Sequence, residues 1–231
     1  SYKYRLRDAL VTPSFDPGSA YGGISKVGNS TRENEITVSG TYDNVYGGHT
    51  DGAGTAKEDK DNSYKNKVTL SGTAHINDTV YGGYTTATAG KTWENTVNIE
   101  GGSAANVVGA KSAGNATRNI VNVTANFTGN VTGGISTAGI AEENTVNLDH
   151  VTVTGDVTGG QGATLANKNV VNMDNATVTG TVKAAATIGA GNTLTVKGTN
   201  HAGNIAGELR CFRCKLRSYP ADPYGWRGDG S

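Results

Sequence analysis

Cys211 and Cys214 are the only two cysteines of the chain, and their Cys-x-x-Cys spacing is one used for redox chemistry and for zinc binding. A redox pair requires a strand followed by a helix that starts at the motif, and a zinc site requires two more ligands nearby. The surrounding sequence predicts neither. The histidines are scattered along the chain, at His49, His75, His150 and His201. We therefore expect structural or incidental cysteines, no metal site and no cofactor.

Carboxylates are the next candidates for chemistry, since enzymes that cleave glycosidic bonds use paired acidic side chains. Asp149, Asp156 and Asp174 share no spacing that would pair them. Asp43, Asp78 and Asp156 stand close to Val-x-Gly-Gly motifs, where capping of a turn is the simpler role. The glycine–aspartate nonapeptide of calcium-binding repeats does not occur in the sequence. We expect no catalytic residues, and a carbohydrate-active lyase or hydrolase is the alternative.

Two short patterns could serve binding. Arg227-Gly228-Asp229 is a tripeptide found in some integrin ligands, but three residues recur easily by chance. Thr152-Val153-Thr154 and Thr177-Val178-Thr179 approach the flat threonine arrays that bind ice or carbohydrate, although the pattern does not extend through the chain. We expect neither pattern to carry the function.

Composition bounds the elements that must position these residues. The 231 residues include 34 glycines, with 35% hydrophobic, 6% aromatic and 17% charged residues. That is too little apolar mass for a thick globular core, and the abundant Thr, Asn and Gly suit turns and solvent-facing strands. The formal net charge is zero, which counts against nucleic-acid binding. No apolar stretch approaches the roughly 18 residues of a membrane span, and the charged start SYKYRLRDAL lacks the apolar centre of a secretory signal.

An internal repeat decides the expected architecture. One element, Asn-x-apolar-x-apolar, occurs seven times, at intervals of 32, 29, 24, 25, 25 and 23 residues. Its asparagines are Asn34, Asn66, Asn95, Asn119, Asn144, Asn169 and Asn192. The alternation is that of a strand with its apolar side chains facing inward. A second element, Val-x-Gly-Gly, alternates with the first, as in Val45–Gly48, Val80–Gly83, Val131–Gly134 and Val157–Gly160.

Such a short unit cannot bury its own apolar face, but stacked copies can, with each strand pairing in parallel with its copy one coil away. The asparagine shares the face of the apolar pair, so we expect an inward ladder of seven amides that satisfy one another along the stack. The alternative is that these asparagines are ordinary turn residues at strand starts. We expect the glycine pairs to mark turns with positive φ or close backbone approach, and the polar segment Asp51–Lys67 to protrude as a loop.

The coils resemble the passenger repeats of autotransporter adhesins of Gram-negative bacteria, because they read Val-Tyr-Gly-Gly, then Glu-Asn-Thr-Val-Asn-Leu, then Gly-x-Val-x-Gly-x-Val. The resemblance covers about residues 20–207 and specifies architecture better than ligand. It implies a right-handed parallel β-helix that is exported from a longer precursor to the cell surface or the exterior. It also implies adhesion or surface display, and we expect a host or bacterial cell-surface glycan or protein as the partner. Self-association through solenoid edges is a further expectation.

The sequence therefore predicts an all-β fold, a right-handed parallel β-helix (β-solenoid) of about seven coils. Residues 1–19 are expected to form an N-terminal cap or partial coil, residues 20–207 the repeats, and residues 208–231 a non-repeat tail. The expected function is that of a non-catalytic structural and adhesive module. A carbohydrate-active β-helix enzyme and a purely structural stalk are the alternatives.

Overall fold

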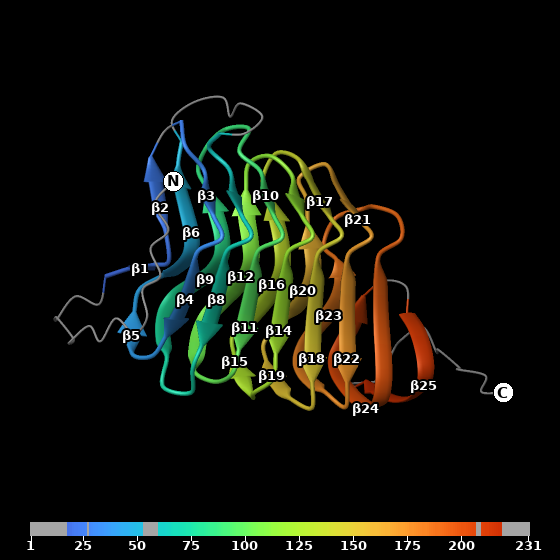
Figure 1. The fold of residues 1–231 in the computed structure, drawn as a ribbon. Helices are drawn as coiled ribbons and strands as arrows, with labels where there is room; N and C mark the ends of the chain where they lie inside the picture. The colour runs from blue at the N-terminus through green and yellow to red at the C-terminus, as the bar shows by residue number, and fades with distance from the viewer. Residues whose placement is uncertain (1–17, 27, 53–59, 207–208, 219–231) are drawn as a thin grey trace.

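A computed structural model of the protein describes residues 18–26, 28–52, 60–206 and 209–218, the last range as the course of a strand. These residues form a parallel β-solenoid of about seven turns, and the coils follow one another along a single axis from the N-terminal to the C-terminal end (Figure 1). They contain strands and turns but no helix, and therefore no helix long and apolar enough to cross a membrane. The predicted fold class is confirmed.

Each full coil has three faces. The first face holds the Asn-x-apolar-x-apolar element and consists of β4 (Glu35–Val38), β8 (Lys67–Leu70), β11 (Thr96–Ile99), β14 (Ile120–Val123), β18 (Thr145–Asp149), β22 (Val170–Asp174) and the start of β24 (Thr193–Ala206). The second face holds the glycine pairs and consists of β1 (Ala20–Tyr21), β2 (Ile24–Lys26), β6 (Val45–Asp51), β9 (His75–Thr85), β12 (Ser103–Ser112), β16 (Asn130–Ser136), β20 (Val157–Gln161) and β23 (Thr177–Ala185).

The remaining strands are short. The third face consists of β3 (Thr31–Arg32), β7 (Ser63–Tyr64), β10 (Thr92–Trp93), β13 (Ala116–Thr117), β17 (Ile140–Glu142) and β21 (Leu165–Asn167), which form a separate six-stranded sheet. Between the first and second faces lie β5 (Thr41–Tyr42), β15 (Phe127–Thr128) and β19 (Thr152–Thr154). At the C-terminal end β25 (Leu209–Ser218) pairs in parallel with β24, so the sheet continues into the predicted tail.

Parallel pairing puts each position of a coil over the same position of the next. On the first face Val97 pairs with Val68 on one side and with Val121 on the other. The inward apolar positions of all seven copies are buried, from Ile36 and Val38 to Leu194 and Val196, as predicted. Aliphatic side chains thus fill one part of the interior, and a second part, behind the third face, holds buried Thr, Ser and Asn.

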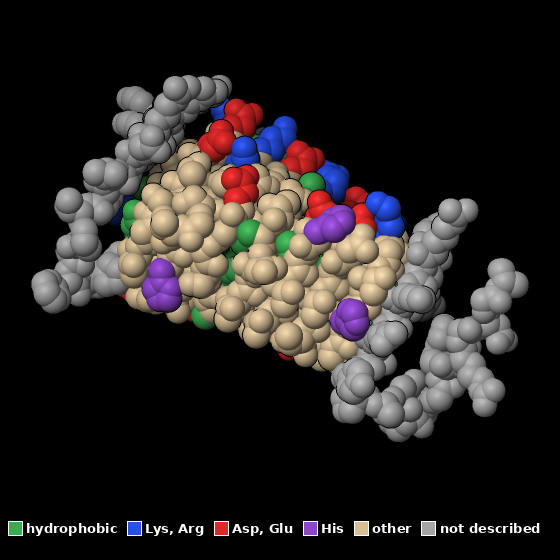
Figure 2. Space-filling view, turned by 90° about the horizontal axis from the view of Figure 1, so that it is seen from below, with side chains coloured by type: hydrophobic (Ala, Val, Ile, Leu, Met, Phe, Trp, Pro, Cys, Tyr) green, Lys and Arg blue, Asp and Glu red, His purple; other side chains and the backbone are tan. Residues whose placement is uncertain are grey.

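The corner before the first face is made by charged residues in the left-handed conformation. Glu33, Lys65, Glu94, Arg118, Glu143 and Lys168 have φ between 49° and 56°, and Gly191 takes the seventh position. Residues other than glycine adopt this backbone conformation at a cost of roughly 1–2 kcal/mol. The sign of the charge alternates from coil to coil, and ion pairs join several neighbours, such as Arg118 with Glu94 at 2.9 Å and Lys168 with Glu143 at 3.3 Å. Figure 2 shows acidic and basic side chains interspersed along this border.

Two expectations for the irregular parts need correction. The glycine pairs are not turns, since Gly47, Gly48, Gly133 and Gly134 lie inside strands and have no positive φ. The segment Asp51–Lys67 is not a loop throughout, because its residues 61–63 are buried and its end forms β7 and the start of β8. Polar residues are needed there, since the interior behind the third face is itself polar: the Thr85 hydroxyl, for example, donates to the Asp61 carbonyl at 2.7 Å.

Candidate functional site

The seven repeat asparagines form one column inside the stack. Each side-chain Nδ2 donates to Oδ1 of the asparagine in the next coil, over six steps of 2.7–3.1 Å from Asn34 to Asn192. The same Oδ1 atoms also accept from the backbone N–H of the preceding asparagine. The five central amides are buried and the two terminal ones are half-buried. This column stabilises the coils and is closed to ligands.

The glycine pairs make room for this column. A Cβ on Gly134 would collide with the amide of Asn144, and a Cβ on Gly160 would collide with that of Asn169. A Cβ on the first glycine of a pair would meet the backbone oxygen of the next coil, as at Gly133 against Gly159. The two repeat motifs are therefore parts of one packing arrangement. Close backbone approach, the second of the two roles expected for the glycines, is the one that applies.

The glycine pairs also shape the outside of the second face. In a regular strand, residues three apart point to opposite faces. Here both glycines face inward, so the strand bends and the side chains before and after the pair converge outside. Across the pair of β6, the rings of Tyr46 and His49 are 4.8 Å apart, and across the pair of β9, those of Tyr81 and Tyr84 are 4.9 Å apart. The bends of successive coils lie over one another, and we call the outer surface along them, which includes the hollow described below, the axial groove.

Aromatic rings fill the N-terminal part of the axial groove. Tyr21, Tyr46 and Tyr81 stack on one another with centroid distances of 5.1 and 5.3 Å and interplanar angles of 9° and 12°. His49 and Tyr84 lie against this stack from the other wall. Burial raises the pKa of Tyr46 to about 12 and also raises the pKa of Tyr81. Burial lowers the pKa of His49, whose two ring nitrogens have no hydrogen-bond partner.

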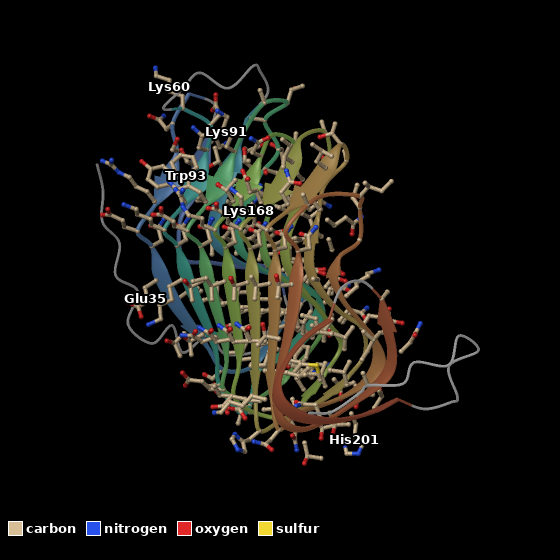
Figure 3. The ribbon with its side chains drawn as sticks, turned by 90° about the vertical axis from the view of Figure 1, so that its right-hand side faces the viewer. Glu35, Lys60, Lys91, Trp93, Lys168 and His201 are labelled. Carbon is tan, nitrogen blue, oxygen red and sulfur yellow. The ribbon has the colours of Figure 1, made fainter. Side chains whose placement is uncertain are left out.

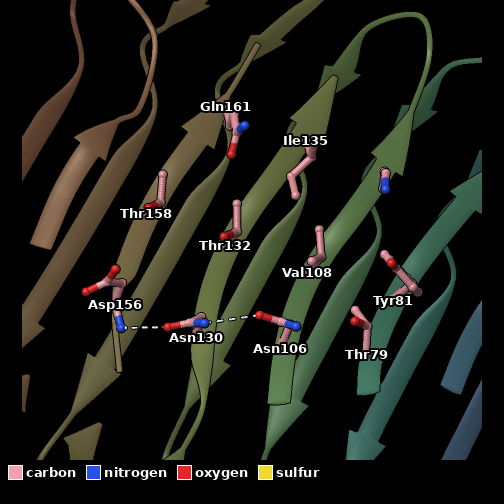
Figure 4. Close-up of a pocket in the computed structure, with 11 residues that line it drawn as sticks. Thr79, Tyr81, Asn106, Val108, Asn130, Thr132, Ile135, Asp156, Thr158 and Gln161 are labelled. Carbon is pink, nitrogen blue, oxygen red and sulfur yellow. Dashed lines mark hydrogen bonds between the residues drawn. The ribbon is translucent and has the colours of Figure 1, made fainter. Parts of the chain in front are cut away.

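Beyond Tyr81 the walls carry smaller side chains, and the axial groove opens into a hollow of about 340 Å³. Its side chains form three rows across β9, β12, β16 and β20, as Figure 4 shows. The rows are Thr79, Asn106, Asn130 and Asp156; Tyr81, Val108, Thr132 and Thr158; and, after the glycine pairs, Tyr84, Lys111, Ile135 and Gln161. All of these except Tyr84 line the hollow.

Hydrogen bonds hold the first row of the hollow in place. Asn130 Nδ2 donates to Asn106 Oδ1 at 3.1 Å, and Asn130 Oδ1 accepts from the backbone N–H of Asp156 at 3.0 Å. Asp156 Oδ1 in turn accepts from the backbone N–H of Thr181 at 2.7 Å. The row is thus pre-ordered, and it presents two amide groups beside the hydroxyls of Tyr81, Thr132 and Thr158. The hollow therefore combines one aromatic end with fixed polar groups.

The carboxylates expected to lie apart require a correction. Asp149 and Asp174 pair in register on neighbouring coils, and Lys197 occupies the same position one coil further. Lys197 Nζ contacts Asp174 Oδ2 at 2.6 Å, which lowers the pKa of Asp174. His150 Nδ1 lies 2.5 Å from Asp149 Oδ1. The prediction missed this because the spacing of 25 residues is the length of the coil between them, which places Asp149 and Asp174 side by side. Asp156, by contrast, lies in the hollow.

The other candidate residues do not add a site. Within the described ranges, no three His, Cys, Asp or Glu side chains gather closely enough to hold a metal ion. Cys211 and Cys214 lie on β25, whose side chains are outside the described residues, as is the Arg227-Gly228-Asp229 tripeptide. The view along the axis in Figure 3 shows the side chains of successive coils in rows, with Trp93 and Lys168 on the third-face side. Trp93 stacks there on Tyr64 at 4.2 Å.

Sequence reasoning did not identify the axial groove. The signal was present in the aromatic and polar residues that flank each glycine pair, such as Tyr81 and Tyr84. It could not be interpreted while the glycines were taken for turns, because residues on either side of a turn need not share a face. Comparison with protein-family models, with curated proteins and with solved structures finds no match.

Proposed function

We infer that the chain is a non-catalytic adhesion module, displayed at a bacterial surface in the manner of autotransporter passenger repeats, and that it binds a cell-surface glycan or protein through the axial groove. One observation carries this proposal: the hollow at the end of the tyrosine stack combines the ring of Tyr81, the fixed amides of Asn106 and Asn130, and threonine hydroxyls. Sugars present hydroxyls to amides and an apolar ring face to aromatic side chains. Away from the second face, the exposed large apolar side chains of the described residues, Ile120, Leu165 and Ile188, are scattered.

The test is to fill the hollow. Thr132→Trp places a large ring in the middle row, and Thr37→Trp places the same ring on the outward side of β4, away from the groove, as the matched control. The labelled chain is applied to cultured epithelial cells and to immobilised glycans. We expect Thr132→Trp to abolish binding and Thr37→Trp to leave it unchanged. Gln161→Trp at the exposed rim serves as a second variant if Thr132→Trp does not fold.

Equal binding by all three variants and the unchanged chain would rule out the axial groove as the contact surface. Absence of binding by the unchanged chain to every surface offered would favour the structural stalk.

The enzyme alternative has one specific observation in its favour, the neighbouring carboxylates Asp149 and Asp174. The ion pair of Asp174 with Lys197 keeps that carboxylate ionised, and the two residues are not among those that line the hollow. Incubation with polysaccharides followed by measurement of new reducing ends tests it directly. Release that disappears in Asp174→Asn would establish catalysis and overturn the adhesion proposal.

A further inference from the structure

Lys111 is the feature of the hollow that the proposed function leaves unexplained. It lies in the third row, between Tyr84 and Ile135 on the neighbouring coils, and its side chain is half-buried. The structure gives Lys111 no ion pair with any described residue. By contrast, several lysine and arginine side chains of the first face and of the corner before it are paired with Asp or Glu. Lysine is the only cation among the side chains that line the hollow. An ammonium without a counter-charge attracts an anionic group of a ligand.

The single carboxylate of the hollow sets where that anionic group can lie. Asp156 belongs to the first row, two strands away from Lys111 along the axis, a separation of roughly 10 Å at the spacing of parallel strands. Its Oδ1 already accepts a backbone hydrogen bond. A ligand that placed its negative charge at the Asp156 end would be repelled. The charge is therefore directed to Lys111, away from Asp156 in the hollow and from Asp78 beside Thr79.

The remaining lining groups describe the rest of the ligand. Asn106, Thr132 and Thr158 are neutral donors and acceptors suited to hydroxyls, and Tyr81 offers a ring face at the end of the stack. One step beyond the hollow, Lys183 pairs in register with Thr158 and continues the middle row. Cations are therefore sparse along the groove. This arrangement suits a sparsely charged chain rich in hydroxyls, whereas a densely sulfated polymer or a nucleic acid would require many more cations.

We propose that the axial groove binds an acidic glycan, a chain of hydroxylated pyranose rings with uronate carboxylates, and that Lys111 receives one carboxylate while Tyr81 receives a ring face. This inference rests on the proposed function and specifies its ligand. The groove runs along the axis, so an extended chain lies across successive coils rather than along one strand.

The experiment measures binding of a galacturonate pentamer and of its fully methyl-esterified form, which keeps the shape but has no charge. Calorimetric titration is done with the whole chain and with Lys111→Met, which keeps the apolar stem, and with Lys91→Met, a lysine outside the hollow, as the charge-matched control. We expect the acidic pentamer to bind about tenfold more tightly than the ester, and Lys111→Met to remove this preference. Lys91→Met should retain it.

Salt provides an independent readout, because raising the ionic strength should weaken the unchanged chain more than Lys111→Met. Equal affinity for acid and ester, or equal effects of the two lysine variants, would overturn the acidic-glycan inference while leaving the groove proposal intact. If neither pentamer binds but Thr132→Trp still abolishes cell binding, the groove binds another ligand and the inference fails. If Thr132→Trp has no effect either, the proposed function fails with it.

Discussion

Each buried asparagine amide is held by both of its neighbours, so its removal should affect more than one group. Asn119 Oδ1 accepts the backbone N–H and the Nδ2 of Asn95, and its own Nδ2 donates to Asn144. Asn119→Ala leaves the buried N–H of Asn95 and the Oδ1 of Asn144 without these partners. An unsatisfied buried group costs roughly 1–3 kcal/mol, and we expect a loss of at least about 2 kcal/mol in the free energy of unfolding.

The matched control is Asn122→Ala. Asn122 belongs to a second amide row on the outside of the first face, where its Nδ2 donates to Asn98 at 3.0 Å and the side chain is only half-buried. Water can replace its partners, so we expect a loss below about 1 kcal/mol. Denaturant unfolding measures both values. Similar losses for the two variants would show that burial of the inner column adds no stability beyond that of the outer amide row.

His49 makes stability depend on pH at the same scale. Its pKa is lowered by burial, so the folded chain keeps it neutral while the unfolded chain takes up a proton below the ordinary value of 6.5. The unfolded state then binds more protons, and the stability contributed by neutral His49 is lost as the pH falls from 6.5 through the folded-state pKa. We expect the denaturant concentration at the midpoint of unfolding to decrease when the pH is lowered from about 7 to about 5.5. His49→Phe should reduce this fall, and His201→Gln, at an exposed position, should not.

At the scale of the element, the second face depends on the absence of side chains at its glycine pairs. A Cβ on Gly133 would press against the backbone oxygen of Gly159, which cannot move without shifting the next strand. We expect Gly133→Ala to cost about 1–3 kcal/mol, as overpacking of a well-packed interior does. Gly72→Ala, where a Cβ would meet open space, should be nearly neutral. Chemical unfolding compares the two, and an equal effect would contradict the close-packing role of the glycine pairs.

At the scale of the whole molecule, each coil contacts only its neighbours, so a complete coil should be removable. Deleting residues 119–143 joins Arg118 to Asn144 and keeps the corner-to-strand junction of every other coil. We expect a folded, shorter solenoid with somewhat lower stability. Deleting residues 119–131 joins Arg118 to Thr132 out of phase and should prevent stacking. Circular dichroism and denaturant unfolding distinguish them. Failure of both deletions to fold would contradict the independence of the coils.

Much of this architecture could be predicted, because the residues that fill the interior recur at the same positions of each coil. Alternation at Val97 and Ile99, repeated over every coil, specifies strand, face and stacking at once. The groove was not predicted, because a recurring glycine pair is equally typical of a turn, whereas Gly82 and Gly83 lie inside β9 and bend the strand. The charged corners were missed for a related reason: nothing about Glu94 in isolation indicates a left-handed conformation. Position within the coil, not residue type, imposes it.

The alternating signs at the corners have a consequence for how such a chain can change its length. Gain or loss of a single coil brings two like charges together, as the removal of residues 119–143 would bring Arg118 beside Lys168, whereas a change by two coils restores the sequence of signs. We therefore expect lengthening by duplication to proceed in even steps. An odd coil should carry a neutral corner, and Gly191, which follows Lys168 at the seventh position, has that property.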